Sequence, residues 1–224
     1  MAEQSETAQS ETESTPSGVA PSETAQSEAE AAGLRKVLEV DVLTDAATQR
    51  LVALWSVALL VPGVAHVAAL VIVGGLAPAG WGWWVALVVG YLVCLPVHEL
   101  IHAAFFKLLG RRGLRVRFGC SSWMLYAGCP GERFPRRRFL AVLVAPFVLL
   151  SLCFLLLGTL GGAPLLAASL FWLHASGCTG DFYFGWVALR HPEAAWCEDT
   201  DRGFALWADG GDCADMPLRA AESE

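Results

Sequence analysis

The chain has 224 residues, of which 55% are hydrophobic, and its formal net charge at pH 7 is −7. Its acidic residues gather at the two ends: residues 1–32 contain seven acidic and no basic residues, and residues 191–224 contain nine acidic and two basic ones. The middle is therefore basic, and its Lys and Arg residues flank long apolar stretches. This pattern is typical of an integral membrane protein and argues against nucleic acid binding.

The N-terminal segment, residues 1–32, consists mainly of Ser, Glu, Thr, Ala and Gln, and the heptapeptide SETAQSE occurs in it twice. It has too little apolar surface to offset the entropy lost on ordering, so it is predicted to be a disordered acidic tail. Residues 33–50 are amphipathic and are expected to lie at the membrane interface before the first crossing.

Two long stretches carry no Asp, Glu, Lys or Arg, residues 51–98 and residues 139–180. Each is too long for one crossing, which needs about 20 residues, and each is interrupted by a segment rich in Gly and Pro. The pattern predicts transmembrane helices at 51–73, 82–107, 139–158 and 165–188. The expected fold class is therefore an all-α membrane protein with four transmembrane helices.

The polar connections complete the predicted domain, which covers residues 33–190. Between the second and third helices, the alternation from Leu114 to Phe118 predicts a short β-hairpin-like segment over 114–126 at the membrane surface. An irregular interfacial loop with snorkelling arginines is the alternative. Residues 191–224 are expected to be a mobile, polar, acidic tail without a core of its own.

The basic residues predict the orientation. Nine of the fifteen Lys and Arg residues lie between the second and third predicted helices, and none lies in the connections at 74–81 and 158–164. With four crossings, all fifteen fall on one side of the lipid bilayer, which the positive-inside rule makes the cytoplasmic side. Both termini are therefore expected in the cytoplasm.

An H-E-x-x-H sequence, His98 to His102, lies within the second predicted helix. Positions four apart share one helix face, so both imidazoles can bind one ion, and Glu99 beside them can act as a base on a metal-bound water. A charged Glu99 facing lipid would cost about 3 kcal/mol or more, which indicates a pocket lined by protein or water. The alternative is a chance match, in which both histidines are hydrogen-bonded core residues.

A catalytic zinc site usually has a third protein ligand, and Asp181 is the best candidate. It is the only formally charged residue between Arg138 and Arg190, and the helical rise puts it at the depth of His98. An interfacial charge at a helix end is the alternative role. His174 lies two turns before Asp181, about 10 Å further outward, and is expected to contact substrate or an oxyanion. A site with His174 as the third ligand stays open.

These motifs resemble those of the zincin membrane peptidases, which are similar to site-2-protease-type intramembrane metalloproteases. The resemblance covers about residues 50–190 and rests on HELIH at 98–102 and on the segment 174–181, which ends in Gly-Asp. It implies that His98, His102 and Asp181 bind Zn²⁺ and that Glu99 is the base. His174 stands where that family commonly has Asn, and the Gly-Asp order is the reverse of that in site-2 proteases.

The expected function is that of a zinc-dependent, membrane-embedded endopeptidase acting on membrane or membrane-proximal peptide substrates near the cytoplasmic face. Since a helix hides its carbonyl groups, the substrate must be extended, and the 114–126 hairpin is expected to bind it by strand addition. Two alternatives come from other classes: a zinc-binding but non-hydrolytic membrane scaffold or adaptor, and a small proton or metal-ion transporter.

Overall fold

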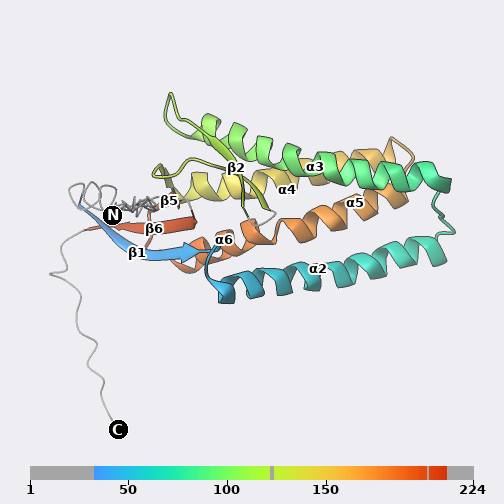
Figure 1. Ribbon diagram of the computed structural model, residues 1–224, viewed down its shortest axis with the longest axis horizontal. Helices are drawn as coiled ribbons and strands as arrows, with labels where there is room; N and C mark the ends of the chain where they lie inside the picture. Colours follow the sequence, from blue (N-terminus) through green and yellow to red (C-terminus); the bar gives the residue numbers. More distant parts are fainter. Residues whose placement is uncertain (1–32, 122–123, 201, 211–224) are drawn as a thin grey trace, which may run out of the picture.

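The fold is seen in a computed structural model, which describes residues 33–121, 124–200 and 202–210. Long helices run side by side along the long axis of the molecule, and a β-sheet lies at one end of them (Figure 1). The segment 1–32, predicted to be a disordered tail, lies outside the described residues.

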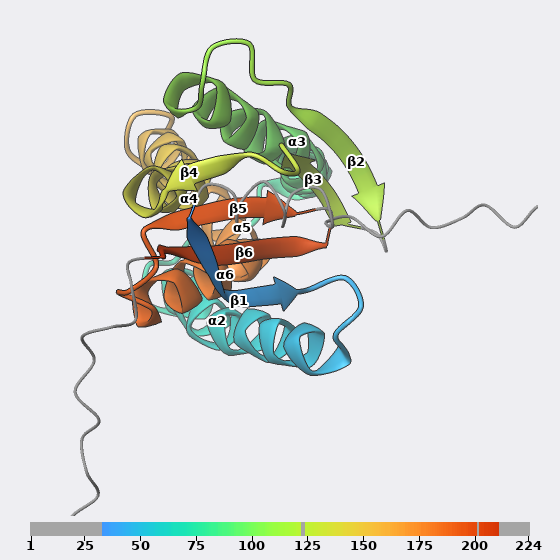
Figure 2. The ribbon, with the colours of Figure 1, turned by 90° about the vertical axis from the view of Figure 1, so that its left-hand side faces the viewer.

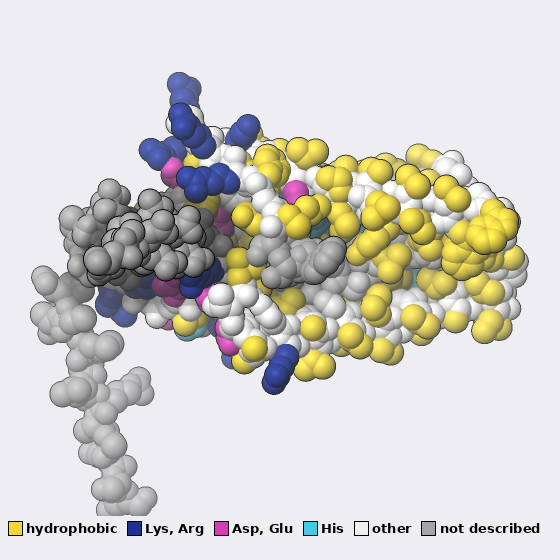
Figure 3. Space-filling view, viewed as in Figure 1, with side chains coloured by type: hydrophobic (Ala, Val, Ile, Leu, Met, Phe, Trp, Pro, Cys, Tyr) yellow, Lys and Arg dark blue, Asp and Glu magenta, His cyan; other side chains and the backbone are white. Residues whose placement is uncertain are grey.

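Three helices are long and apolar enough to cross a membrane: α2 (Ala46–Ile72), α3 (Gly80–Leu109) and α4 (Arg136–Thr159). They correspond to the first three predicted crossings, each extended at its ends. Their outer surface is apolar over most of its length, with Lys and Arg side chains gathered at the sheet end (Figure 3). Side chains such as Val64 and Ile72 remain exposed, as expected for helices solvated by lipid. The protein is therefore a membrane protein.

The helix α2 begins at a well-defined cap. The Asp45 carboxylate accepts hydrogen bonds from the backbone N–H groups of Ala47 and Thr48 and from the Thr48 hydroxyl. The Thr48 hydroxyl and these N–H groups hold the pKa of Asp45 below its ordinary value, so the cap is ionised at neutral pH.

The fourth predicted crossing, 165–188, is not one helix. It consists of α5 (Pro164–Gly177) and α6 (Thr179–Arg190), which meet at Cys178. Neither piece is long enough alone to cross a membrane, so the described residues contain three candidate crossings and not four. The hydropathy pattern missed this break because Gly177-Cys178-Thr179-Gly180 contains no charge and no proline.

The all-α prediction is wrong, because a four-stranded sheet joins the two ends of the described chain (Figure 2). All its neighbouring strands are antiparallel, in the order β1-β6-β5-β4. The strands are β1 (Leu34–Asp41), β4 (Arg133–Pro135), β5 (Trp196–Thr200) and β6 (Gly203–Asp209).

Two expectations fail at this sheet. Residues 33–50 do not form an amphipathic interfacial segment throughout, because strand β1 occupies 34–41. A register shift between Lys36 and Leu38 interrupts the alternation of apolar and polar residues along β1. The spacing of its apolar residues therefore resembles that of a helix. The expected mobile tail after Arg190 contains β5 and β6, and the side chains from Phe204 to Ala208 are buried. The acidic residues on both sides of this short apolar run made the segment resemble a polar tail in the sequence.

A separate hairpin lies in the loop between α3 and α4, as predicted. Its strands β2 (Arg117–Ser121) and β3 (Met124–Gly128) pair antiparallel and begin and end slightly later than the expected 114–126. Strand β3 packs along α3, the helix that carries the H-E-x-x-H sequence.

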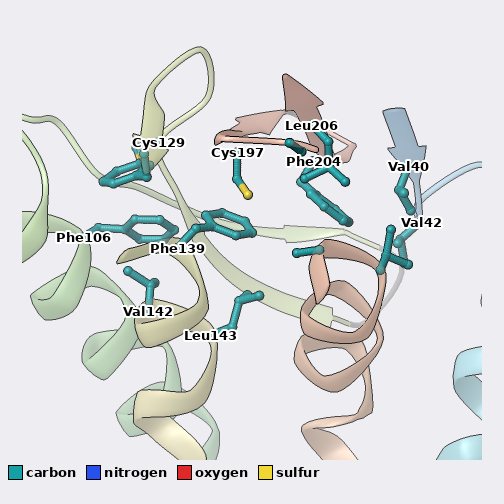
Figure 4. Close-up of a cluster of buried hydrophobic side chains, with 14 of the residues drawn as sticks. Val40, Val42, Phe106, Cys129, Phe139, Val142, Leu143, Cys197, Phe204 and Leu206 are labelled. Carbon is teal, nitrogen blue, oxygen red and sulfur yellow. The ribbon is translucent and has the colours of Figure 1, made fainter. Parts of the chain in front are cut away.

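The main core lies where the sheet meets the helices (Figure 4). Phe139 of α4 packs between Phe106 of α3 and Phe204 of β6, with ring centroids of Phe139 and Phe204 5.8 Å apart. Val142, one turn further along α4, is fully buried in the same cluster. This core therefore fixes the inner ends of α3, α4 and α6 relative to one another, and the candidate site lies just beyond it.

Candidate metal centre

The helix α3 brings His98 and His102 together as the four-residue spacing predicts. Their Nε2 atoms lie 3.0 Å apart, and their rings are inclined by 76°. His102 is buried and His98 partly buried, so neither ring faces open lipid. Two imidazole nitrogens therefore converge on one point inside the helix bundle.

Asp181 comes to the same point from α6. Its Oδ2 atom is 3.2 Å from Nε2 of His98, and its Oδ1 atom is 3.3 Å from Nε2 of His102. Asp181 lies in the first turn of α6, where the N-terminal end of the helix dipole favours a negative charge. The break at Cys178 creates this helix start, so the interruption of the fourth predicted crossing helps to hold a carboxylate inside the bundle.

The spacing of the three donors fits a zinc ion. Zinc–ligand bonds of about 2.0–2.1 Å at tetrahedral angles place neighbouring donor atoms about 3.3 Å apart. The separations here are 3.0, 3.2 and 3.3 Å. Two neutral imidazoles and one carboxylate are a donor set that zinc takes in hydrolytic enzymes, with the fourth position left for water. The residues present therefore suit zinc in both chemistry and spacing.

A backbone carbonyl orients the second histidine. Nδ1 of His102 lies 3.0 Å from the carbonyl oxygen of Val142, which can only accept a hydrogen bond. The proton of neutral His102 is thereby placed on Nδ1, which leaves the lone pair of Nε2 directed at the metal position. Since Val142 belongs to the main core, the packing under the sheet sets the orientation of this ligand.

His174 lies beside the site, as a neighbour of His98. Its Nε2 atom is 3.1 Å from Nδ1 of His98, and it is almost completely buried against Phe147 and Phe154. The sequence predicted that His174 would lie about 10 Å further outward than Asp181 along one continuous helix. This displacement is smaller in the structure, because α5 ends at Gly177 and the chain turns before α6 begins. In this position His174 contacts His98. Its expected contact with substrate or an oxyanion stays a prediction.

Glu99 lies next to the three donors without being one of them. It is partly buried and interacts electrostatically with His98, His102 and Asp181. The backbone N–H of Ala127 in β3 also lies near its carboxylate. Glu99 is thus placed between the metal position and the hairpin, which is where a base acting on water beside a bound peptide is needed.

Two residues near the site were missed from the sequence. Val142 could not be found, because its contribution is a backbone carbonyl and any residue supplies one. Cys178 was not singled out in the sequence, and its Sγ atom is 3.3 Å from Nε2 of His174. Its position four residues after His174 was the available signal. His66 of α2 accepts a hydrogen bond from Nε1 of Trp172, at 3.0 Å.

Comparison with known families gives one match. Residues 91–196 match the model of a family described as "Putative zincin peptidase". The resemblance to zincin peptidases is thus confirmed. The zincin-like segment begins within α3 and ends at the start of β5, so it contains all the candidate ligands, Glu99 and His174. Its description points to zinc as the cofactor and to peptide hydrolysis. No curated protein and no solved structure matches the chain significantly.

Proposed function

We propose that the protein is a zinc-dependent endopeptidase embedded in the membrane, which cleaves membrane or membrane-proximal peptide substrates near the cytoplasmic face. The observation that carries the proposal is the triangle of His98, His102 and Asp181 donor atoms, with Glu99 adjacent to it. The zincin peptidase match over the same residues supports it.

The residues divide the chemistry among them. His98, His102 and Asp181 would hold the zinc, which when bound polarises a scissile carbonyl and makes a water more acidic. Glu99 takes the proton of the attacking water and delivers it to the leaving amine. The N-terminus of α6 and the carbonyl of Val142 keep two of the ligands in place while this occurs.

The free edge of β3 is the proposed binding place for an extended substrate. Among the described residues β3 pairs with β2 alone, and the backbone N–H of Ala127 lies near the Glu99 carboxylate. A peptide that added to this edge would place its carbonyl groups close to the base and the metal position. The likeness to site-2 proteases is consistent with such a site inside the membrane boundary, and it remains part of this proposal.

The experiment separates metal binding from hydrolysis. The full chain, purified in detergent, is assayed for zinc content and for cleavage of a peptide library built on transmembrane segments. Glu99→Gln is expected to keep about one zinc per chain and to lose cleavage by at least 10²-fold, as for removal of a general base. His98→Ala and Asp181→Ala are expected to lose zinc as well.

Glu39→Gln, an exposed carboxylate on β1, is the matched control and should retain both zinc and cleavage. Zinc without cleavage in the unaltered protein, or cleavage unaffected by Glu99→Gln, would overturn the hydrolase and leave the non-hydrolytic zinc-binding scaffold as the better explanation.

A further inference from the structure

A second set of metal donors lies on the other side of the His98 ring. It consists of Nδ1 of His98, Nε2 of His174 and Sγ of Cys178. The nitrogen atoms are 3.1 Å apart, and the sulfur atom lies 3.3 Å from His174 Nε2 and 3.9 Å from His98 Nδ1. An ion with two nitrogen ligands and one sulfur ligand needs separations of about 3.3–3.7 Å, which these values bracket.

We propose that His98, His174 and Cys178 form a second metal site, which takes Cu(I) and competes with the zinc position for His98. The inference goes beyond the proposed peptidase function, because it assigns a different ion to a different donor set. It also gives roles to His174 and Cys178 that peptide hydrolysis does not require.

The charge of the site favours a soft monovalent cation. Cys178 is fully buried, and His174 is 4% exposed and packs against the rings of Phe147 and Phe154. A thiolate and two neutral imidazoles around Cu(I) have no net charge, whereas the same donors around Zn²⁺ carry one positive charge. A thiolate ligand selects Cu(I), and the neutral Cu(I) complex needs no counter-charge in this apolar interior.

Binding is a simple exchange of ions at the thiol. The S–H bond of Cys178 breaks, the sulfur forms a bond to Cu(I), and the proton is released to solvent. The copper remains in the monovalent state and no electron is transferred, so a reductant is needed in the experiment only to prevent oxidation by air.

Competition follows from the tautomers of His98. A neutral imidazole has one nitrogen lone pair, so His98 can bind an ion through Nε2 or through Nδ1, but not through both without becoming an imidazolate. When Nδ1 binds Cu(I), the proton moves to Nε2, which can donate it to Oδ2 of Asp181 over the existing 3.2 Å. The zinc position then loses one of its three ligands without any movement of the backbone.

The test measures Cu(I) affinity rather than peptidase activity. The full chain in detergent, under anaerobic conditions with ascorbate, is titrated against a chromogenic Cu(I) chelator. Asp181→Ala, which removes the zinc position but keeps His98, is expected to bind one Cu(I) per chain. Adding Cys178→Ser to this variant is expected to weaken binding at least about 100-fold, because a soft ligand is replaced by a hard one.

Cys94→Ser supplies the matched control. Cys94 is also buried, one turn before His98 on α3, but it belongs to neither donor set. Its replacement should leave Cu(I) affinity within about threefold, and helix content by circular dichroism should show that both serine variants fold. Unchanged Cu(I) affinity in the Cys178→Ser variant, or loss of affinity with Cys94→Ser instead, would overturn the proposal.

A second measurement tests the competition itself. One equivalent of Cu(I) is expected to release zinc from the unaltered chain and to leave it bound in Cys178→Ser. Retention of zinc in both proteins would contradict a shared His98. Failure of the peptidase proposal would give a different result. The zinc-loaded protein would then show no cleavage, while the Asp181→Ala variant would still bind Cu(I) with the expected affinity.

Discussion

At the level of single residues, His98 is the residue on which the site depends most. Its Nε2 atom faces His102 and Asp181, and its Nδ1 atom faces His174. A histidine that binds zinc through Nε2 must carry its proton on Nδ1, and that proton needs an acceptor when the ring is out of contact with water. In the proposed zinc-bound state Nε2 of His174 is placed to be this acceptor, which would require the proton of His174 to be on its Nδ1.

Replacing His174 tests this orienting role. His174→Ala is expected to weaken zinc binding about 10–100-fold, because Nδ1 of His98 loses its acceptor and the ring is no longer fixed. Competition against a zinc-selective chelator measures the affinity. His174→Asn, which restores an acceptor, should recover part of the loss, and a general structural defect would not be repaired by this polar residue. His66→Ala serves as the control, since His66 bonds Trp172 away from the site; equal loss in both variants would contradict the role.

At the level of elements, the break between α5 and α6 brings two of the site residues close to His98. It ends α5 just after His174 and starts α6 just before Asp181, so both reach His98 from one connection. Thr179 fixes this connection, since its hydroxyl lies 2.6 Å from that of Ser56 in α2. An unbroken helix would have put His174 about two turns from Asp181 along its axis.

The β3 edge gives a prediction about substrate binding. Ala127→Pro removes the backbone N–H group near Glu99, so an added strand could not bond to β3 through this position. We expect a raised KM for extended peptide substrates, about tenfold, with zinc content unchanged. Replacing Arg115–Phe118 with a Gly/Ser stretch alters the first two residues of the partner strand β2 and should have a larger effect. Cleavage kinetics unaltered in both variants would exclude strand addition.

The sheet depends on a buried ion pair. Glu198 of β5 is 5% exposed, and its Oε2 atom accepts a hydrogen bond of 2.8 Å from Nε of Arg133 in β4. Glu198→Ala is expected to lower the free energy of unfolding by about 2 kcal/mol or more, because Arg133, a partly buried cation, loses this partner. Glu39→Ala breaks an exposed pair with Lys36 and should cost less than about 1 kcal/mol. Denaturant unfolding in detergent compares the two, and equal effects would refute the difference in burial as the cause.

The sequence was sufficient where the signal is local. The three long helices follow from charge-free length, and the pairing of His98 with His102 follows from a spacing of four. Asp181 was found because one charge in an apolar helix needs a partner. The sheet was not found, since β1 and β6 come from opposite ends of the described chain and neither is marked by a clean alternation. The contact of His174 with His98 was missed because it depends on a helix break without a Pro signal.

At the level of the whole molecule, the sheet constrains the path of the chain. Strand β1 precedes α2 and pairs with β6, which follows α6, so the chain returns to the end of the bundle from which it started (Figure 1). The Lys and Arg side chains gather at that same end, away from the apolar surface of the helices (Figure 3). Because basic residues are retained in the cytoplasm, the sheet end is proposed to be cytoplasmic, together with both termini.

Cysteine labelling tests this topology. The background has Cys120, Cys153 and Cys213 replaced by Ser, and one new cysteine is introduced at a time. Ala77→Cys lies in the connection between α2 and α3, at the far end of the bundle, whereas Arg112→Cys lies in the basic loop after α3. A membrane-impermeant maleimide should label Ala77→Cys in intact cells and Arg112→Cys only after permeabilisation, because the intervening helix α3 is long enough to separate the two faces. Labelling of both from one side would rule out a membrane crossing by α3, and the reverse pattern would place the basic end outside.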